Sequence, residues 1–487
     1  MISFVLSLIV LLIGYFVYGR FVEKVFGPDD RPTPAVAKAD GVDFIVLPNW
    51  KVFMIQFLNI AGTGPIFGAI MGAKFGPVAY LWIVFGCIFA GATHDYLSGM
   101  LSMRHGGVGL PELIGKYLGS WPRRIMVVFT ILLLIMVGTV FVYSPAEILH
   151  SIKGDTLMWI IIIFCYYIIA TMLPIDKIIG KIYPLFAISL LFMAGALMVW
   201  LFLHWPTLPE LWTNFYNMGL ATEPDKWTDA IFPALFITIA CGAICGFYAT
   251  QSPLMARCVK TEKVGRPIFY GAMITEGIVA LIWATVASWF FYGNPAPGYE
   301  LIANATQGFH TSAPAVVNLV CNDWLGVAGA ILAMLGVVAA PITSGDTAFR
   351  SCRLIVAEWI KIDQRPIVKR LLICVPLFAV SICMLVWQIE NPDGFNTIWQ
   401  YFGWSNQALS VFTLWTLTVY LVRHNKPFII TLIPALFMTT VCTTFLFVSK
   451  QAFHLPGTIA YPMGIACLVI AIVWFILWYL KFKKTQK

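Results

Sequence analysis

Long apolar runs alternate with short polar, often basic loops along the whole chain. A run of about 20 apolar residues can cross a bilayer as a single helix. The pattern predicts an all-α integral membrane protein with about 13 transmembrane helices and no soluble domain. The expected spans are 3–22, 50–72, 77–102, 123–143, 156–173, 182–204, 230–252, 268–291, 325–347, 369–389, 397–421, 429–448 and 459–480.

Composition agrees with this class. Of 487 residues, 60% are hydrophobic and 11% are charged, which excludes an ordinary soluble domain. The 11 cysteines lie almost all in apolar runs without CxxC spacing, so we expect packing residues and no metal framework. No GxxxxGK[ST] motif is present, so we expect neither ATP-driven pumping nor a cofactor.

The basic residues predict the orientation. With alternate loops assigned to the cytoplasm, all but four of the 31 Lys and Arg residues fall on that side. The exceptions are Lys74, Lys153, Lys226 and Lys450. This bias follows the positive-inside rule, and it places the N-terminus outside and the C-terminus inside a bacterial cytoplasmic membrane. The net charge of +8 therefore indicates topology, and no nucleic-acid partner is expected.

The second expected span is interrupted near its middle by Ala61-Gly62-Thr63-Gly64-Pro65. Glycine and proline disfavour a helix interior by about 1 and 3 kcal/mol. In hydrocarbon, the freed backbone groups need protein or a water-filled cavity beside them. We expect a broken helix whose Gly62, Thr63 and Gly64 contribute to a substrate or ion site. The alternative is a kink that serves close helix packing.

The run at 230–252 has a similar small-residue centre from Ala240 to Gly246, which includes Cys241 and Gly242. Counting from each interrupted span gives five helices, over 50–204 and 230–421, in opposite orientations. This is the inverted-repeat arrangement of many secondary transporters, and chance occurrence of two kinked helices is the alternative. The expected units are 1–49, 50–204, 205–421 and 422–487. A short apolar piece from Ala313 to Val320 is expected to be interfacial or re-entrant.

Ionisable residues inside spans are rare and are functional candidates. His94, Asp95, Glu276 and Asp346 fall towards the inner side, where they could form a proton relay or gate. Wetting near helix ends is the alternative, and Asp346 could instead pair with Arg350 one turn away.

Hydroxyl and amide groups form a further set of candidates. Thr343 and Ser344, beside carbonyls freed near Ile60 to Gly62, could bind Na⁺, or could bond back to their own helix. The aromatic and amide cluster 399–407 places Asn406 and Gln407 deeper than an interfacial belt. Tyr248, Gln251 and Asn406 complete the expected substrate site with the residues of both breaks.

Four blocks of the sequence resemble the carbon starvation (CstA) family. They are IAGTGPIFGAIMGAKFGPVAYLWIVFG, FAGATHDYLSGMLSMRHGG, CGAICGFYATQSPLMARC and YFGWSNQALS, between about residues 58 and 410. The resemblance implies an inner-membrane transporter for peptides or, in some members, pyruvate, with a LeuT-like core. The chain departs from the family at Cys245 and Tyr248, where relatives often have Ser and His, so the resemblance does not bring a proton-carrying role to Tyr248.

These observations predict a secondary active importer of short peptides or small carboxylates, and not an enzyme. Coupling to protons is favoured over Na⁺, because four titratable groups exceed what a sodium site requires. A membrane sensor that binds the nutrient without carrying it is the alternative, although no cytoplasmic output domain is visible. An intramembrane hydrolase is a third class, which no HExxH motif or paired carboxylate supports.

Overall fold

The computed structural model describes residues 1–486 except 42, 173–174, 215–229, 294–312, 365 and 392–393. Within these residues all regular elements are helices. The N-terminal half contains α1 (Ile2–Phe16), α2 (Tyr18–Phe26), α3 (Pro34–Ala37), α4 (Asn49–Ile60), α5 (Gly64–Met71), η1 (Gly72–Phe75), α6 (Val78–Leu81), η2 (Trp82–Gly91), α7 (Ala92–Arg104), α8 (Leu110–Leu118), α9 (Ser120–Ile152), α10 (Thr156–Met172) and α11 (Ile175–His204).

The C-terminal half continues with η4 (Ile231–Leu235), α12 (Phe236–Thr238), α13 (Tyr248–Ala256), η5 (Glu262–Val264), η6 (Arg266–Tyr270), α14 (Gly271–Ser288), η7 (Trp289–Gly293), α16 (Ala313–Ile360), α17 (Ile367–Glu390), α18 (Gly394–Arg423), α19 (Ile429–Val448) and α20 (Gly457–Gln486). The expected piece 313–320 is the start of α16, which bends at Gly326, a residue with φ of 63°.

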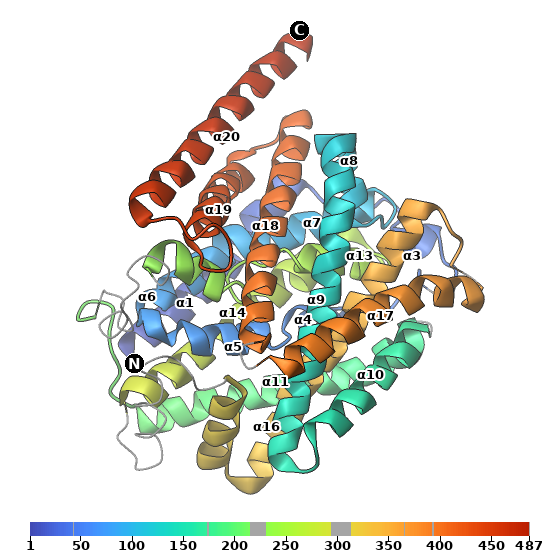
Figure 1. Cartoon of the computed structure of the whole chain (residues 1–487). Coiled ribbons are helices and arrows are strands. Elements are labelled where there is room, and N and C mark those ends of the chain that lie inside the picture. The colour runs from blue at the N-terminus through green and yellow to red at the C-terminus, as the bar shows by residue number, and fades with distance from the viewer. Residues whose placement is uncertain are drawn as a thin grey trace.

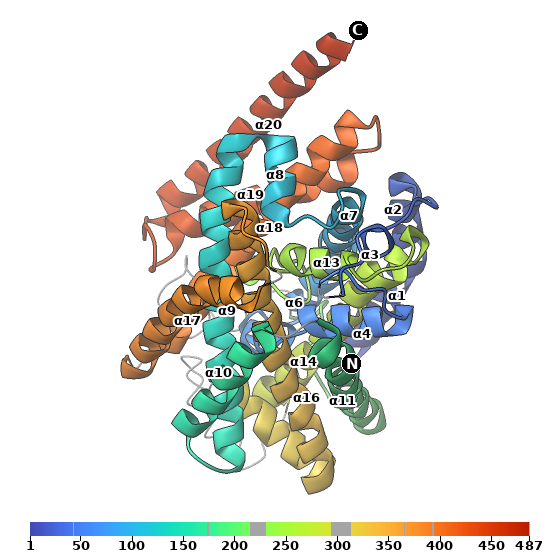
Figure 2. The same ribbon diagram turned by 90° about the vertical axis from the view of Figure 1, so that its right-hand side faces the viewer.

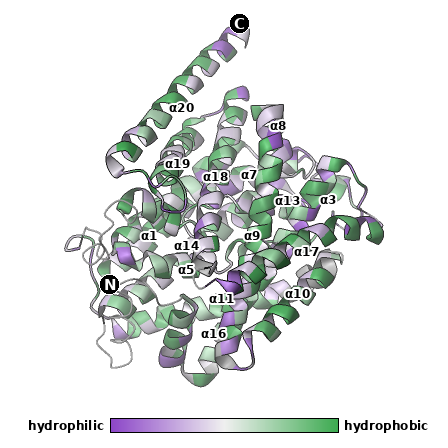
Figure 3. Cartoon of the chain, in the orientation of Figure 1, coloured by the Kyte–Doolittle hydropathy of each residue, from purple (hydrophilic) through white to green (hydrophobic). Residues whose placement is uncertain are grey.

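The long helices α9 and α16 pack along each other through the middle of the molecule, and α11 packs against α16 (Figure 1). Helix α14 packs against both short helices α4 and α5, α13 packs against α4, and α7 packs against α13. At the other end, α18, α19 and α20 pack in sequence order, and α20 extends away from the body with its apolar residues exposed (Figures 1 and 3).

Among the described residues, ten helices are long and apolar enough to cross a membrane, so the chain is a multi-pass membrane protein. The three remaining expected spans differ in kind. The helix α10 has 17 residues, the 230–252 stretch is divided into short helices, and α18 is 30 residues long but more polar. The number of thirteen crossings, the unit boundaries and the inverted repeat stay predictions.

Both expected interruptions are present. Helix α4 ends at Ile60, α5 begins at Gly64, and the intervening residues are buried. The second interruption separates α12 from α13 and covers residues 239–247, which are also buried. Glycine, proline and small side chains therefore end these helices inside the protein, where other elements supply partners for the freed backbone groups.

Candidate functional site

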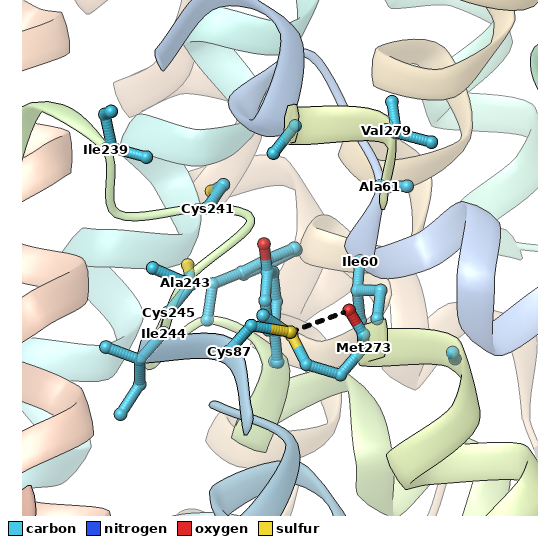
Figure 4. Packing of buried hydrophobic residues seen from close by; sticks show 14 of the residues in the cluster. Ile60, Ala61, Cys87, Ile239, Cys241, Ala243, Ile244, Cys245, Met273 and Val279 are labelled. Carbon is cyan, nitrogen blue, oxygen red and sulfur yellow. Dashed lines mark hydrogen bonds between the residues drawn. The ribbon is translucent and has the colours of Figure 1, made fainter. Parts of the chain in front are cut away.

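The two breaks lie against each other in the core. A Cβ atom added to Gly64 would lie 2.3 Å from Cys241 Sγ, and one added to Gly68 would lie 3.0 Å from the Thr238 carbonyl oxygen. Figure 4 shows Ile60 and Ala61 of the first break across from Cys241 and Cys245 of the second. The tertiary structure thus joins the expected residues Gly64 and Cys241, which are far apart in sequence. Side chains larger than glycine do not fit at Gly64 without displacing the second break.

Glu276 holds the second break in place. Its Oε1 accepts a hydrogen bond from the Gly242 N–H at 3.1 Å and a short one from the Tyr248 hydroxyl. Gly242 has φ of +88°, a left-handed conformation that favours glycine. Glu276 Oε2 has no partner among the described residues. Gly242 and Tyr248, expected in the substrate site, and Glu276, expected in the proton relay, therefore form one buried hydrogen-bonded group.

His94 and Asp95 form a buried pair on α7. His94 Nδ1 lies 3.0 Å from Asp95 Oδ1, and both side chains are fully buried. Their other polar atoms, Nε2 and Oδ2, have no partner within the described chain. The preceding turn supports the second break directly, because a Cβ atom at Gly91 would lie 2.1 Å from the Ala243 carbonyl oxygen. The helix that carries the pair therefore begins beside the backbone of the second break.

Ser344 of α16 contacts the last turn of α4. Its hydroxyl donates to the carbonyl oxygens of Leu58 and Asn59, at 3.2 and 3.0 Å. These carbonyls lie slightly earlier than the Ile60 to Gly62 carbonyls expected from the sequence. Thr343 bonds instead to Ala340 of its own helix at 2.8 Å, which is the alternative considered for it. Hydroxyl and carbonyl oxygens of this kind suit a hard cation such as Na⁺.

Asp346 belongs to a different contact. Its Oδ2 accepts a 2.7 Å hydrogen bond from the hydroxyl of Tyr183 on α11, and the same hydroxyl lies 3.1 Å from the Thr343 carbonyl oxygen. Arg350 donates to the Ala170 carbonyl oxygen at 2.7 Å. The four expected relay residues are thus divided, since Glu276 is bonded to the second break and Asp346 is bonded to α11.

Buried amide groups surround both breaks, and the sequence reasoning overlooked two of them. Gln56 Oε1 and both side-chain polar atoms of Asn59 lack partners within the described residues, as do the Thr63 hydroxyl, Gln251 Oε1 and the Asn406 side chain. A buried polar atom without a partner costs about 1–3 kcal/mol, so such a concentration marks a polar binding region. Amides inside an apolar span, directly before its glycines, were the available signal.

Two further contacts fix the expected residues Gln251 and Asn406. Gln251 Nε2 donates to Thr250 Oγ1 at 2.9 Å and to Ser351 Oγ at 3.4 Å. The Asn406 carbonyl oxygen accepts from the Gly246 N–H at 3.0 Å, and a Cβ atom at Gly246 would lie 2.3 Å from that oxygen. Helix α16 therefore contacts α13, and α18 contacts the second break itself.

Aromatic rings cover the breaks on one side. Phe141 Cζ lies 3.1 Å from the position of a Cβ atom at Gly62. The Phe141 ring centroid is 5.9 Å from that of Phe402, which in turn is 5.5 Å from Trp399. Trp399 is 5.9 Å from Phe67 of α5. These four buried residues, the aromatic stack, close the direct path from Gly62 to that surface.

Residues 27–48, here called the strap, pack against the chain after α13 and against α16. The Ile45 and Leu47 N–H groups donate to the carbonyl oxygens of Arg257 and Cys258, at 3.2 and 3.1 Å. Asp43 Oδ1 lies 3.8 Å from guanidinium nitrogens of both Arg350 and Arg353 on α16. Figure 2 shows the strap helix α3 beside α13. The strap therefore joins the second broken helix to α16.

Arg104 and Arg31 hold the first residues of the strap through hydrogen bonds and ion pairs. Arg104, the last residue of α7, donates to Glu262 at 3.0 Å and to the Gly27 carbonyl oxygen at 2.6 Å. Hydrogen bonds from Arg31 hold the pKa of Asp29 well below its usual range, so this carboxylate stays charged near neutral pH. The basic loops assigned to one side by the sequence thus meet on one face of the molecule.

Solved structures of similar fold are transporters. The chain aligns with a manganese transporter of Eremococcus coleocola at a TM-score of 0.55 and 11% identity, over 91% of this chain and 98% of that one. It aligns with a Na⁺-coupled sialic acid symporter at a TM-score of 0.53 and 14% identity. This alignment covers 95% of this chain and 96% of the symporter. The chain therefore shares the fold of these two transporters.

The family follows from the sequence. Residues 1–152, 142–321 and 298–445 match the model of the carbon starvation protein CstA family. The chain belongs to this family, as the four blocks indicated.

Some relatives of the chain carry transporter names. An uncharacterized membrane protein of Haemophilus influenzae is 44% identical over 61% of this chain and 92% of its own length. The peptide transporter CstA of Campylobacter jejuni is 28% identical over 89% of this chain and 78% of its own length. The pyruvate/proton symporter BtsT of Escherichia coli is 26% identical over 69% of this chain and 56% of its own length.

Proposed function

We propose that the protein is a secondary active transporter that imports short peptides or small carboxylates such as pyruvate across the bacterial inner membrane. The observation that carries the proposal is the contact between two broken helices near buried polar atoms that lack partners among the described residues. The names of the relatives support transport and these two substrate classes. We infer that the breaks belong to a LeuT-like core of two inverted five-helix repeats.

In this proposal the substrate binds between the breaks. The N-termini of α5 at Gly64 and α13 at Tyr248 would present positive dipole ends to its carboxylate. Gly62, Thr63, Cys241, Gly242, Gln251 and Asn406 would complete the site. The aromatic stack and the strap would open in turn, so that the site faces one side of the membrane at a time. Their closure on both sides corresponds to an occluded state.

We propose protons as the coupling ion. Glu276 is bonded to the backbone and to Tyr248 of the second break, so its protonation would change the hydrogen bonds that hold this segment. The His94–Asp95 pair would relay the proton. Sodium is the alternative, and the contact of Ser344 with two α4 carbonyls favours it.

The test is uptake of labelled pyruvate and dialanine into proteoliposomes containing the purified protein. One arm imposes a pH gradient in sodium-free buffer, and the other imposes a sodium gradient at uniform pH. Accumulation driven by the pH gradient alone is expected. Accumulation driven only by sodium would assign coupling to Ser344 and Thr343. Binding of these compounds without uptake in either arm would favour a nutrient sensor.

A further inference from the structure

A group of buried polar side chains lies on the strap side of both breaks. It consists of Gln56 of α4, Thr250, Gln251 and Ser252 of α13, and Ser351 of α16, and is here called the inner polar cluster. We propose that this cluster is a release site, which accepts the N–H groups of a peptide substrate on its way from the breaks to the inner side of the membrane. This inference rests on the proposed transport function and adds a second site to it.

The hydrogen bonds that join the three helices within the cluster are long. Gln56 Nε2 donates to Ser252 Oγ at 3.5 Å. Gln251 Nε2 donates to Ser351 Oγ at 3.4 Å, and Ser351 Oγ donates to the Thr250 carbonyl oxygen at 3.3 Å. Hydrogen bonds from N–H groups to oxygen are most often about 2.9–3.0 Å long, so these contacts are weak. Helices α4 and α16 can therefore separate from α13 here at little cost.

The open hydrogen-bonding capacity of the cluster points to a donor ligand. Gln56 Oε1 and Gln251 Oε1 are buried without a partner among the described residues, whereas both amide nitrogens have one. A buried acceptor that lacks a donor destabilises the closed arrangement. An ammonium group or a peptide N–H supplies this donor, and pyruvate contains neither. Water supplies the same donor, so the experiments below compare a substrate that has N–H groups with one that has none.

The cluster begins next to the breaks. Gln56 lies one turn before Ile60, where α4 ends at the first break. Gln251 is in the first turn of α13, which starts at Tyr248 directly after the second break. Ser252 Oγ donates to the Tyr248 carbonyl oxygen at 3.1 Å. A substrate that leaves the breaks between α4 and α13 therefore meets both glutamines first.

The cluster ends next to the strap. Ser351 is followed on α16 by Arg353, a guanidinium nitrogen of which lies 3.8 Å from Asp43 of the strap. Leu354, about one turn after Ser351, lines a cavity of about 520 Å³ together with Asp43. Other walls of this cavity come from the basic loops that the sequence assigns to the inner side. Movement of the strap would thus connect the cluster to this cavity.

Uptake kinetics in proteoliposomes provide the first test. Gln56→Leu removes the acceptor and nearly retains the size of the side chain, so the maximal rate of dialanine uptake is expected to fall at least about fivefold. The rate for pyruvate is expected to change less than about twofold, because pyruvate has no N–H group. Gln388→Leu on α17 is the matched control, since Gln388 is a buried glutamine outside the cluster, and should change neither rate. Equal loss for both substrates, no loss for either, or transport of pyruvate alone would overturn the release site.

Labelling provides a test that does not depend on transport. Ser252→Cys places a thiol in the cluster, and Thr139→Cys, at a buried hydroxyl between α9 and α17, is the control. Inverted vesicles are treated with a membrane-impermeant thiol reagent, and modification at each position is followed by mass spectrometry. Position 252 is expected to react at least about tenfold faster than position 139. Dialanine is expected to slow the reaction at position 252 at least about fivefold, and pyruvate is not.

The outcomes separate the two proposals. Protection by dialanine without uptake in proteoliposomes would retain the site and reject import. Uptake without protection would reject the site and retain import. Protection by pyruvate as strong as that by dialanine would overturn recognition of N–H groups. Modification of position 252 only in sealed spheroplasts, or from neither side, would overturn the assignment of the cluster to the release path.

Discussion

Glu276 shows how one side chain can connect proton binding to backbone geometry. Its carboxylate accepts from the N–H of Gly242, inside the second break, and from the hydroxyl of Tyr248, the first residue after it. Loss of the negative charge would weaken both charge-assisted bonds. Tyr248 therefore acts as a hydrogen-bond donor to the Glu276 carboxylate.

We predict that Glu276→Gln reduces uptake driven by a pH gradient more than tenfold, while exchange of internal for external substrate changes only a few-fold. Exchange requires the site to alternate but requires no net proton movement. Both rates are measured in the same proteoliposome preparation. Glu112→Gln, at an exposed carboxylate paired with Arg123, is the control and should leave both rates unchanged. Equal loss of both activities would assign Glu276 a structural role alone.

At the first break, glycine at position 64 is required because the Cys241 side chain packs directly against its Cα. We predict that Gly64→Ala lowers the free energy of unfolding by about 1–3 kcal/mol, because its Cβ atom would overlap Cys241. Gly195→Ala on α11 is the control, since no atom lies within 4 Å of its Cβ position. Thermal unfolding in detergent measures both. Partial recovery in the Gly64→Ala, Cys241→Gly double variant is also expected, and full stability of Gly64→Ala alone would contradict the contact.

At the scale of elements, the strap connects the chain after α13 to α16. It is held by two backbone hydrogen bonds to residues after α13 and by Asp43 between two arginines of α16. In the proposed transport cycle, the strap would release one of these partners when that side opens. Asp43 is buried, so solvent screens its attraction to Arg350 and Arg353 only weakly.

We predict that Asp43→Asn loosens the strap and exposes Cys258, which is buried beneath it. The rate of Cys258 alkylation is expected to rise about tenfold, which corresponds to roughly 1.4 kcal/mol of local closure. Asp30→Asn in the same segment is the control, because Asp30 forms an exposed pair with Lys263. No difference between the two variants would show that Asp43 does not hold the strap.

At the scale of the whole molecule, charge placement and packing agree on two faces. The residues that join α7, the strap, α13 and α16 lie on the face that the positive-inside rule assigns to the cytoplasm. Lys74 and Lys450, two of the four basic residues that the rule does not assign to this face, line one cavity. The basic end of α20, with Lys481 and Lys484 exposed, is expected on the cytoplasmic face.

We predict that trypsin removes a tag fused after Lys487 in inverted membrane vesicles and leaves it intact in sealed spheroplasts. The basic end of α20 provides the cleavage sites. Loss of the tag is followed by immunoblotting, and detergent-opened spheroplasts provide the control for protease activity. Cleavage in intact spheroplasts would reverse the predicted orientation. It would also move the strap from the predicted inner face to the outer face.

The sequence by itself determined the class of the protein and where its helices are interrupted. Apolar runs of spanning length, glycine and proline at positions 61–65 and the small residues at 240–246 act locally, so their effects can be predicted without the fold. The family was equally accessible, because four long blocks of residues carry it. The number of spans, the repeat and the orientation stay predictions.

Only the tertiary structure decided which of these residues meet. It brought Glu276 to Gly242 and Tyr248, placed Ser344 on the carbonyls of Leu58 and Asn59, and assigned Asp346 to Tyr183. It also brought Lys74 and Lys450 to one cavity. Such contacts depend on how distant helices pack, and a local pattern of polar and apolar residues contains no information about the partner that a buried polar atom will find.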